Sequence, residues 1–286
     1  MVNKFIPNHS LCLGCSAGMA AAEIMNATHE PIILVLATGC LEVGTTTFPH
    51  TSWNVPTIHV AFGSAPAVAS GIARAKKVLG QKTKIIVIAG DGATYDIGLQ
   101  SLLGMAERGE DVLYICYNNQ AYMNTGIQKS GATPTGAENT TLLDWQDSQE
   151  IYKKSVIKIL ETMNIPYIAQ SIPAFDNDLG KKIGKALKIN GPKYIEILSP
   201  CIRGWYYEAK DSKKIIDLAV ETNFWPLYEI ELGKLKINYH PKNKIEISEW
   251  LELQKRFKNV LENKQLIEQI QNNIDLNWQE LLKKND

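Results

Sequence analysis

The fold is decided by two stretches of sequence, Lys84-Ile85-Ile86-Val87-Ile88-Ala89-Gly90-Asp91-Gly92 and Val112-Leu113-Tyr114-Ile115-Cys116-Tyr117-Asn118-Asn119. Each is a continuous apolar run, rich in β-branched or aromatic residues, that ends in a polar motif. Such runs are typical of strands buried on both faces of a parallel sheet. Because ligands bind at the carboxyl ends of parallel strands, we expect Gly90-Asp91-Gly92 and Asn118-Asn119 to form two halves of one polar site.

Predicted strands and helices alternate on either side of these motifs, which indicates an α/β fold with a doubly wound, mainly parallel sheet. Further strands are predicted at 31–37, 167–169 and 194–198, an edge strand at 226–230, and helices at 16–27, 64–79, 98–108, 148–163 and 179–189. Residues 38–63 and 118–142 are predicted to be long loops, which are usually functional in compact domains. We expect residues 1–235 to form this domain, and residues 236–286 to form a helical extension packed on the core or on a partner subunit.

The composition is that of an ordinary globular protein. Of the 286 residues, 45% are hydrophobic and 21% are charged, and the formal net charge is zero. Nucleic-acid and membrane-surface binding need a basic excess, so neither kind of partner is expected. No apolar run approaches the roughly 18 residues that span a bilayer. The first eight residues contain no apolar signal-peptide core, and we expect a cytoplasmic protein.

The polar site at the strand ends is suited to Mg²⁺ and a diphosphate. Mg²⁺ prefers octahedral oxygen ligands and is usually held by few protein groups together with phosphates and water. Asp91 can supply a carboxylate, Asn119 an amide oxygen, and Ala121 a backbone carbonyl once the chain turns. Gly90 and Gly92 let phosphate oxygens approach the backbone without a Cβ clash. The pattern predicts a Mg²⁺-bound diphosphate, and thiamine diphosphate in particular.

The five cysteines do not resemble a disulfide framework, because their number is odd and the chain is long. Cys12 and Cys15 form a close pair, whereas Cys40 follows the first predicted strand and Cys201 follows a later one. These four thiolates could converge on a [4Fe-4S] cluster or on zinc. One close pair with two distant cysteines favours the cluster. Cys116 lies inside an apolar strand and is expected to belong to the core.

With these residues in view, the chain resembles the β subunit of a multi-subunit 2-oxoacid:ferredoxin oxidoreductase, and most of all pyruvate:ferredoxin oxidoreductase (pyruvate synthase). The resemblance extends over nearly the full length. It depends on residues 12–17, 37–43, 51–62, 90–98 and 118–128. It implies a thiamine-diphosphate-binding fold for residues 1–235, with a [4Fe-4S] cluster bound beside the cofactor.

The resemblance also implies roles for individual residues. Cys12, Cys15, Cys40 and Cys201 would ligate the cluster, while Asp91, Asn119 and the Ala121 carbonyl would hold Mg²⁺. Asn124 would lie close to the reactive carbon of the cofactor and is the residue expected to act in catalysis. The cofactor would contact Cys40, Leu41, Val43, Gly90, Asp91, Gly92, Ala93, Asn119, Gln120, Ala121, Tyr122, Met123 and Asn124.

The implied reaction is the oxidative decarboxylation of pyruvate by coenzyme A to acetyl-CoA and CO₂, with electrons passed to ferredoxin. The glutamate that activates the cofactor pyrimidine has no convincing candidate in this chain. In the family it belongs to the α subunit, and further γ- and δ-type subunits or domains carry additional clusters. The chain is therefore expected to be active only with its partner chains.

Some positions depart from the family pattern. Single-chain relatives have a cofactor-contacting glutamate where this chain has Ala17, and Ser16 and the Gly63-Ser64 pair replace residues expected as glycine and Glu-Asn. These departures affect fine contacts with the cofactor. His50 and His59 could serve substrate binding or proton transfer but are more often structural in such loops, and Arg203 could tune the cluster or form an interface pair.

Three alternatives stay open at the level of sequence. The same chemistry could act on another 2-oxoacid, such as 2-oxoisovalerate or oxalate. A non-oxidative thiamine enzyme would need the diphosphate site but would have no use for four converging cysteines. A zinc-stabilised, non-catalytic subunit would use the cysteines without redox chemistry.

Overall fold

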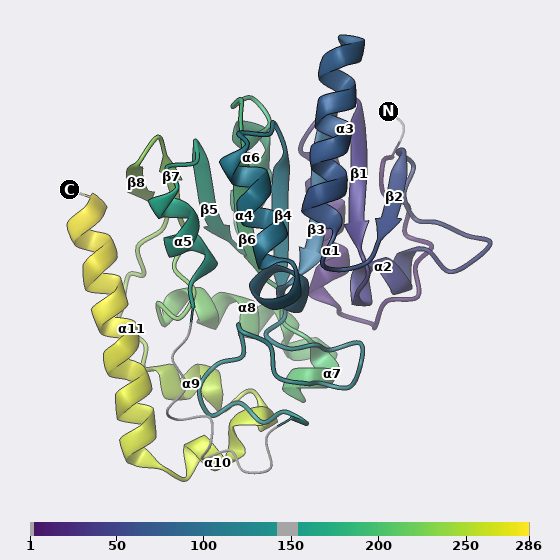
Figure 1. The fold of residues 1–286 in the computed structure, drawn as a ribbon. Helices are drawn as coiled ribbons and strands as arrows, with labels where there is room; N and C mark the ends of the chain where they lie inside the picture. The colour runs from purple at the N-terminus through teal and green to yellow at the C-terminus, as the bar shows by residue number, and fades with distance from the viewer. Residues whose placement is uncertain (1–2, 142–153, 286) are drawn as a thin grey trace.

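The computed structural model describes residues 3–141 and 154–285, and these form an α/β fold around one eight-stranded sheet (Figure 1). The strand order is β2-β1-β3-β4-β6-β5-β7-β8. β1 to β6 pair in parallel, and β7 runs antiparallel to both β5 and β8. The strands are β1 (Ile32–Ala37), β2 (Thr57–Val60), β3 (Lys84–Gly90), β4 (Leu113–Asn118), β5 (Tyr167–Ser171), β6 (Lys193–Leu198), β7 (Tyr228–Glu231) and β8 (Lys234–Ile237). The expected fold class is confirmed.

The central strands are buried on both faces, as their continuous apolar sequences predict. Successive side chains of a strand point to opposite faces. In β3, Ile86 and Ile88 therefore pack into one core layer, and Ile85, Val87 and Ala89 into the other. The first layer is covered by α1 (Ser16–Asn26) and α6 (Asp178–Ala186), and the second by α3 (Ala65–Leu79), α4 (Leu99–Glu107) and α5 (Val156–Thr162).

The segment 38–63 was expected to be a loop and is more ordered than that. It contains α2 (Cys40–Thr45) and β2 (Thr57–Val60), and β2 pairs in parallel with β1 in the register Leu34 to Thr57. β2 is a short, half-exposed edge strand, so its sequence lacks the apolar run that marks the buried strands. The expectation of a structureless loop was wrong for this reason.

The helix expected over 148–163 begins at Val156 among the described residues. The Ser155 hydroxyl caps it by accepting a hydrogen bond from the Lys158 backbone N–H at 3.2 Å. The earlier part of that expectation falls on residues 142–153 and lies outside the described residues.

The connections place a topological switch point between β1 and β3. From β1 the chain moves outward through α2 to β2, and it then crosses back over β1 to enter β3. Open α/β sheets form a crevice at the carboxyl ends of two strands related in this way, and ligands bind there. The Gly-Asp-Gly motif at the end of β3 lies at this crevice, directly followed by a π-helical turn, η1 (Gly92–Ile97).

The C-terminal part builds a third core below the carboxyl edge of the parallel strands (Figure 1). Of its aromatic members, Trp205, Trp250 and Phe257 are fully buried. The elements are α7 (Ile202–Trp205), η3 (Ala209–Asp211), α8 (Ser212–Glu221), α9 (Ile247–Leu251), η4 (Lys255–Phe257), α10 (Lys258–Leu261) and α11 (Lys264–Asn285).

The last helix, α11, runs along the β8 end of the sheet (Figure 1). Its Leu281 packs against the second core layer, and its Glu280 forms an ion pair with Lys158 of α5 at 3.0 Å. The extension therefore packs on the core of the same chain, and the boundary expected between residues 235 and 236 falls inside β8. Within the described residues, no helix combines the length and the apolar character needed to cross a membrane.

Candidate functional site: a diphosphate and metal crevice beside four cysteines

The two strand-end motifs lie side by side. β3 and β4 pair in the register Gly90 to Tyr117, so Asp91 and Asn118 follow neighbouring positions at the same edge of the sheet. The backbone N–H of Asn119 donates a 3.3 Å hydrogen bond to Asp91 Oδ1. The two motifs are therefore neighbours at one edge of the sheet, and their joint role as a binding site stays a prediction.

Asp91 is a buried carboxylate, with only 1% of its surface exposed. Its Oδ2 accepts a short hydrogen bond from the Ser130 hydroxyl. Burial raises the pKa of the Asp91 carboxyl to about 7, although the hydrogen bonds from Ser130 and from the Asn119 backbone act to lower it. Removal from water disfavours the charged form, so this carboxylate gains from a cation placed against it.

The side chain of Asn119 lies between the two other groups that the sequence predicts to hold Mg²⁺. One atom of its carboxamide lies 2.9 Å from Asp91 Oδ1 and 2.7 Å from the Ala121 carbonyl oxygen. A carboxamide nitrogen in that position donates hydrogen bonds to both oxygens. If a cation were bound between the three groups, the carboxamide oxygen would take the position instead. Neighbouring ligands of octahedral Mg²⁺ lie about 3.0 Å apart when each metal–oxygen distance is about 2.1 Å, which is close to both of these separations.

A cavity of about 110 Å³ opens next to this ligand set. The predicted site residues that line it are Cys40, Gly90, Asp91, Gly92, Ala93, Asn119, Ala121, Tyr122, Met123 and Asn124. Leu41, Val43 and Gln120 do not line it. Leu41 is buried in the first core layer, Val43 is about half exposed on α2, and Gln120 points its side chain toward the C-terminal extension.

Five further residues line the cavity that were not predicted as site residues: Thr38, Gly39, Phe62, Tyr117 and Thr125. Thr38, Gly39 and Phe62 closely follow β1 or β2, and Thr125 adjoins Asn124, so proximity in sequence was the available signal. Tyr117 is different, because its hydroxyl would lie only 2.5 Å from a Cβ at Gly39. Gly39 is thus required by the close approach of a side chain from β4, which no local pattern reveals.

Glycine is also required at position 92, because the Tyr122 ring lies close to its backbone. A Cβ at this position would lie 2.3 Å from the Tyr122 ring. The Tyr122 hydroxyl donates hydrogen bonds to the Gly92 carbonyl at 3.2 Å and to Asp96 Oδ2 at 3.1 Å. The absence of a side chain at Gly92 therefore lets Tyr122 join the π-helical turn to the loop that carries Asn119 and Ala121.

Four of the five cysteines gather near the same edge of the sheet. Cys15 precedes α1, Cys40 begins α2 and lines the cavity, and Cys201 precedes α7. Burial, together with the nearby Cys201, Cys15 and Cys12 thiols, raises the pKa of the Cys40 thiol to about 12. Four thiols close enough to influence one another form a donor set suited to an iron–sulfur cluster. Cys116, in contrast, is fully buried in β4, as expected for a core residue.

The cysteine sulfurs also receive backbone hydrogen bonds. The Gly204 N–H donates to Cys201 Sγ at 3.3 Å, and burial raises the pKa of Cys201 while the N–H groups of Gly204 and Arg203 lower it. Hydrogen bonds to sulfur are a general means of tuning clusters. Over residues 3–141 and 154–285, no three His, Cys, Asp or Glu side chains lie close enough together to hold a single metal ion.

A buried arginine lies behind the loop that follows β4. Arg256, from η4, donates from Nη2 to Gln120 Oε1 at 2.7 Å, and its guanidinium stacks on the Trp205 ring at 3.7 Å. The Trp205 indole N–H in turn donates to the Asn119 carbonyl at 2.8 Å. Arg256 lies in the extension, far in sequence from both motifs, so no local pattern marks it as a neighbour of the site.

His50, His59 and Arg203, whose roles the sequence did not decide, do not line the cavity. His59 Nδ1 lies 3.1 Å from Glu42 Oε1 on the exposed face of β2. His50 and Arg203 are exposed. Their expected roles in substrate binding or tuning stay predictions.

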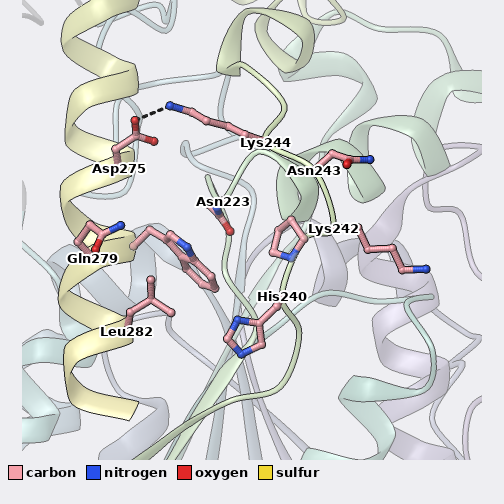
Figure 2. A pocket seen from close by; sticks show the side chains of 10 residues that line it. Asn223, His240, Lys242, Asn243, Lys244, Asp275, Gln279 and Leu282 are labelled. Atoms are coloured by element: carbon pink, nitrogen blue, oxygen red, sulfur yellow. Dashed lines mark hydrogen bonds and ion pairs between the residues drawn. The ribbon is translucent and has the colours of Figure 1, made fainter. Parts of the chain in front are cut away.

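A second hollow lies against α11, at the β8 end of the sheet, as Figure 2 shows. It is lined by His240 and Lys242 from the segment after β8 and by Gln279 from α11. Lys244 joins the two sides through an ion pair with Asp275 at 2.8 Å. No residue predicted for the site lines this hollow, so the strand-end cavity is the candidate site.

Comparison with known proteins assigns the family. Residues 37–197 match the family model described as thiamine pyrophosphate enzyme, C-terminal TPP binding domain. The chain is 44% identical over 281 residues to the pyruvate synthase subunit PorB of Methanocaldococcus jannaschii, covering 95% of this chain and 94% of that one. It is 40% identical to PorB of Thermotoga maritima, covering 96% and 90%. The chain belongs to the PorB family of pyruvate synthase subunits.

As a PorB-family chain it is one subunit of a multi-chain thiamine pyrophosphate enzyme, which confirms the resemblance found in the sequence. A subunit named for a different substrate is also similar: the ketoisovalerate oxidoreductase subunit VorB of Pyrococcus abyssi is 41% identical, covering 98% of this chain and 93% of that one. The structure of 2-oxoglutarate:ferredoxin oxidoreductase from Magnetococcus marinus superposes with a TM-score of 0.55 at 19% identity, covering 70% and 72%. That likeness supports the fold alone.

Proposed function

We propose that this chain is the β subunit of a pyruvate:ferredoxin oxidoreductase that carries Mg²⁺-thiamine diphosphate and a proximal [4Fe-4S] cluster. The assembled enzyme would convert pyruvate and coenzyme A to acetyl-CoA and CO₂ and pass the electrons to ferredoxin. One observation carries the proposal: a carboxamide atom of Asn119 lies 2.9 Å from Asp91 Oδ1 and 2.7 Å from the Ala121 carbonyl oxygen, in a crevice whose lining includes Cys40. The names of the PorB relatives support the choice of substrate.

Different residues of the crevice would contact different parts of the cofactor. Asp91, Asn119 and Ala121 would ligate Mg²⁺, and the backbone of residues 90–93 would approach the diphosphate. Residues 119–124 would line the thiazolium, with Asn124 closest to the reacting carbon. When bound, thiamine diphosphate supplies an electron sink for the loss of CO₂ from a 2-oxoacid.

The four cysteines would hold the cluster next to this crevice. Cys40 lines the cavity and is electrostatically coupled to Cys12, Cys15 and Cys201, so it would lie between the cofactor and the cluster. The cysteines comprise one close pair, Cys12 and Cys15, and two that are distant in sequence, Cys40 and Cys201. This pattern favours the cluster over the zinc-stabilised subunit, which would need all four sulfurs around one ion.

The chain would depend on partner subunits. Among the residues described as lining the cavity there is no glutamate to activate the pyrimidine of the cofactor. We therefore place that group on an α subunit and further clusters on γ- and δ-type subunits or domains. The isolated chain is expected to show no turnover with pyruvate, coenzyme A and ferredoxin, as an anaerobic assay against the complete complex would measure. Turnover by the isolated chain at the rate of the complex would contradict this dependence.

Replacement of Asp91 tests the metal site. Asp91→Asn removes the charge that balances Mg²⁺, so binding of Mg²⁺-thiamine diphosphate should weaken at least about 100-fold while iron content stays unchanged. Calorimetric titration of the apo complex measures the first quantity, and iron analysis the second. Ser130→Ala retains the ligand and should lose much less affinity. Equal loss of cofactor and iron in Asp91→Asn would indicate misfolding and would not support the assignment.

Anaerobic purification tests the cluster and the substrate. A broad visible absorption that dithionite bleaches is expected, with iron and sulfide in similar amounts. Stoichiometric zinc without iron would refute the cluster. Because the VorB relative is as similar as several PorB relatives, the complex should also be assayed against pyruvate, 2-oxoisovalerate and oxalate. Pyruvate is expected to give the highest kcat/KM.

A further inference from the structure

A buried carboxylate lies beneath the crevice. Glu196, in β6, has 1% of its surface exposed. Among the described residues, no lysine, arginine or histidine forms an ion pair with it. An isolated buried carboxylate is costly unless hydrogen bonds satisfy its oxygens. The side chains that donate hydrogen bonds to Glu196 therefore show which parts of the structure this residue orients.

Three side chains donate hydrogen bonds to Glu196. The Tyr95 hydroxyl and the Asn118 carboxamide both donate to Oε1, at 2.5 and 2.7 Å. The Tyr194 hydroxyl donates to Oε2 at 3.2 Å. Tyr95 belongs to the π-helical turn after Gly90-Asp91-Gly92, and Asn118 begins the second motif. A single oxygen atom thus joins the two halves of the site.

The hydrogen bond from Asn118 to Glu196 also orients the turn that holds two of the proposed metal ligands. With its nitrogen held by Glu196, the Asn118 carboxamide turns its oxygen toward the Gln120 backbone N–H, which donates to it at 3.0 Å. Gln120 has a positive φ of 67°, a strained conformation for a residue with a side chain. This turn sets where the Asn119 side chain and the Ala121 carbonyl point. The Asn118 bond therefore supports two of the three proposed Mg²⁺ ligands.

The bond to Tyr95 supports the third ligand. Tyr95 lies four positions after Asp91 in a turn whose Thr94 hydroxyl also donates to the Gly90 carbonyl at 2.8 Å. Anchoring the Tyr95 hydroxyl to β6 therefore fixes the turn that begins at Asp91. Burial raises the pKa of Glu196, and the three donors act to lower it.

We propose that Glu196 is a positioning residue of the diphosphate–metal site, which locks the Gly-Asp-Gly turn and the Asn-Asn turn at the separation that Mg²⁺ requires. The inference rests on the proposed Mg²⁺-thiamine diphosphate function and extends it to a residue from a third strand. Groups that orient metal ligands typically contribute about 10- to 100-fold in metal affinity. Glu196 never contacts the cofactor in this scheme; it acts through Asn118 and Tyr95.

Two substitutions separate this role from simple packing. Glu196→Met keeps the volume but removes both acceptors, and it should weaken Mg²⁺-dependent binding of thiamine diphosphate by about 10- to 100-fold. Glu196→Gln restores an oxygen that can accept from Tyr95 and Asn118, while its NH₂ can donate to the Tyr194 hydroxyl. It should bind within a few-fold of the unaltered protein. Calorimetric titration of the apo complex with thiamine diphosphate at saturating Mg²⁺ measures both.

Glu229 supplies the matched control. It is also a buried carboxylate in the sheet, in β7, and accepts a 2.7 Å hydrogen bond from the Tyr167 hydroxyl. It has no bond to either motif, so Glu229→Met should lose stability without losing cofactor affinity. Tyr95→Phe removes only one hydroxyl and keeps the ring packed, so it tests the same link in a protein that folds. The affinity of Tyr95→Phe for thiamine diphosphate should also fall, but by less than that of Glu196→Met.

The outcomes are distinct. Equal affinities for Glu196→Met and Glu229→Met, or an unchanged affinity in Tyr95→Phe, would overturn the positioning role. Rescue by Glu196→Gln together with loss in Glu196→Met supports it. If the unaltered complex binds no Mg²⁺-thiamine diphosphate, the proposed function fails first. If Glu196→Met melts below assay temperature, Tyr95→Phe decides.

Discussion

At the scale of single residues, the site is governed by the burial of charged and polar groups. Asp91 has lost almost all contact with water, and its hydrogen-bond donors, which include Ser130 and the Asn119 N–H, compensate this only partly. Its raised pKa reflects the part of the free-energy cost of burying the charge that these hydrogen bonds do not offset. A divalent cation between Asp91, Asn119 and Ala121 would offset the rest.

Mg²⁺ binding should therefore depend on pH through Asp91. The carboxyl has a pKa of about 7 in the absence of metal, so below that pH it carries a proton that Mg²⁺ must displace. Affinity for Mg²⁺ should fall about tenfold for each pH unit below 7 and level off above it. Calorimetric titration of the apo complex between about pH 5.5 and about pH 8.5 measures this. An affinity that stays constant down to the lowest pH would contradict the assignment of Asp91 as a ligand.

At the scale of elements, the π-helical turn η1 connects the strand to the loops. Its wide winding is seen in the hydrogen bond from the Gly98 N–H to the Ala93 carbonyl at 2.9 Å. Such turns are rare and are frequent at functional sites. It directs Asp96 toward the loop after β4, where Oδ2 accepts from the Gly131 N–H at 2.9 Å and from the Tyr122 hydroxyl at 3.1 Å. Asp96 thereby ties that loop to the end of β3.

The substitution Gly92→Ala tests this connection. Its methyl group would overlap the Tyr122 ring, so Tyr122 must leave its place in the cavity lining. Overpacking of this kind costs about 1–3 kcal/mol of unfolding free energy, and cofactor affinity should fall with it. Gly71→Ala in α3 is the matched control, because no atom lies within 4 Å of the added Cβ and helix propensity favours alanine. Thermal melting and cofactor titration of both variants would show the difference; equal behaviour would argue against the contact.

At the scale of the whole molecule, the C-terminal extension reaches the site from outside the sheet. Arg256 is fully buried, and in the described residues no carboxylate forms an ion pair with it. Amide oxygens of Gln120 and Gln254 and the faces of Trp205 and Phe257 hold its guanidinium instead. Burial lowers its pKa, while the nearby Cys201, Tyr207 and Asp91 raise it. The extension thus contributes to the loop on which Asn119 and Ala121 lie.

Removing the buried Arg256 charge should weaken cofactor binding, although Arg256 does not line the cavity. Arg256→Met deletes the hydrogen bond to Gln120, worth about 1–1.5 kcal/mol, so thiamine diphosphate affinity should fall about tenfold. Arg256→Lys keeps the charge without the planar stacking and should be intermediate. Lys258→Met on the same segment removes an exposed cation and should have no effect on affinity, since exposed ion pairs contribute little. Equal affinities in Arg256→Met and Lys258→Met would show that the extension does not support the loop.

Much of this molecule could be predicted from sequence because the signals are local. Continuous apolar runs identified the buried strands β1, β3, β4 and β6, and glycine, aspartate and asparagine directly after them identified the crevice. The two edge strands, β2 and β8, were not predicted, because half-exposed strands lack such runs. The boundary of the extension was drawn from a change of periodicity, which did not reveal that β8 continues the sheet.

The sequence by itself determined the parallel sheet, the identity of the proposed Mg²⁺ ligands and the family, since each depends on residues adjacent in the chain or on an overall likeness to relatives. Only the tertiary structure decided which distant groups support those ligands. Ser130 lies 39 positions from Asp91, Glu196 lies 78 from Asn118, and Arg256 lies 136 from Gln120. The physical reason is that strand and helix periodicities report which face a residue occupies, whereas the pairing of buried polar groups depends on how the faces are brought together.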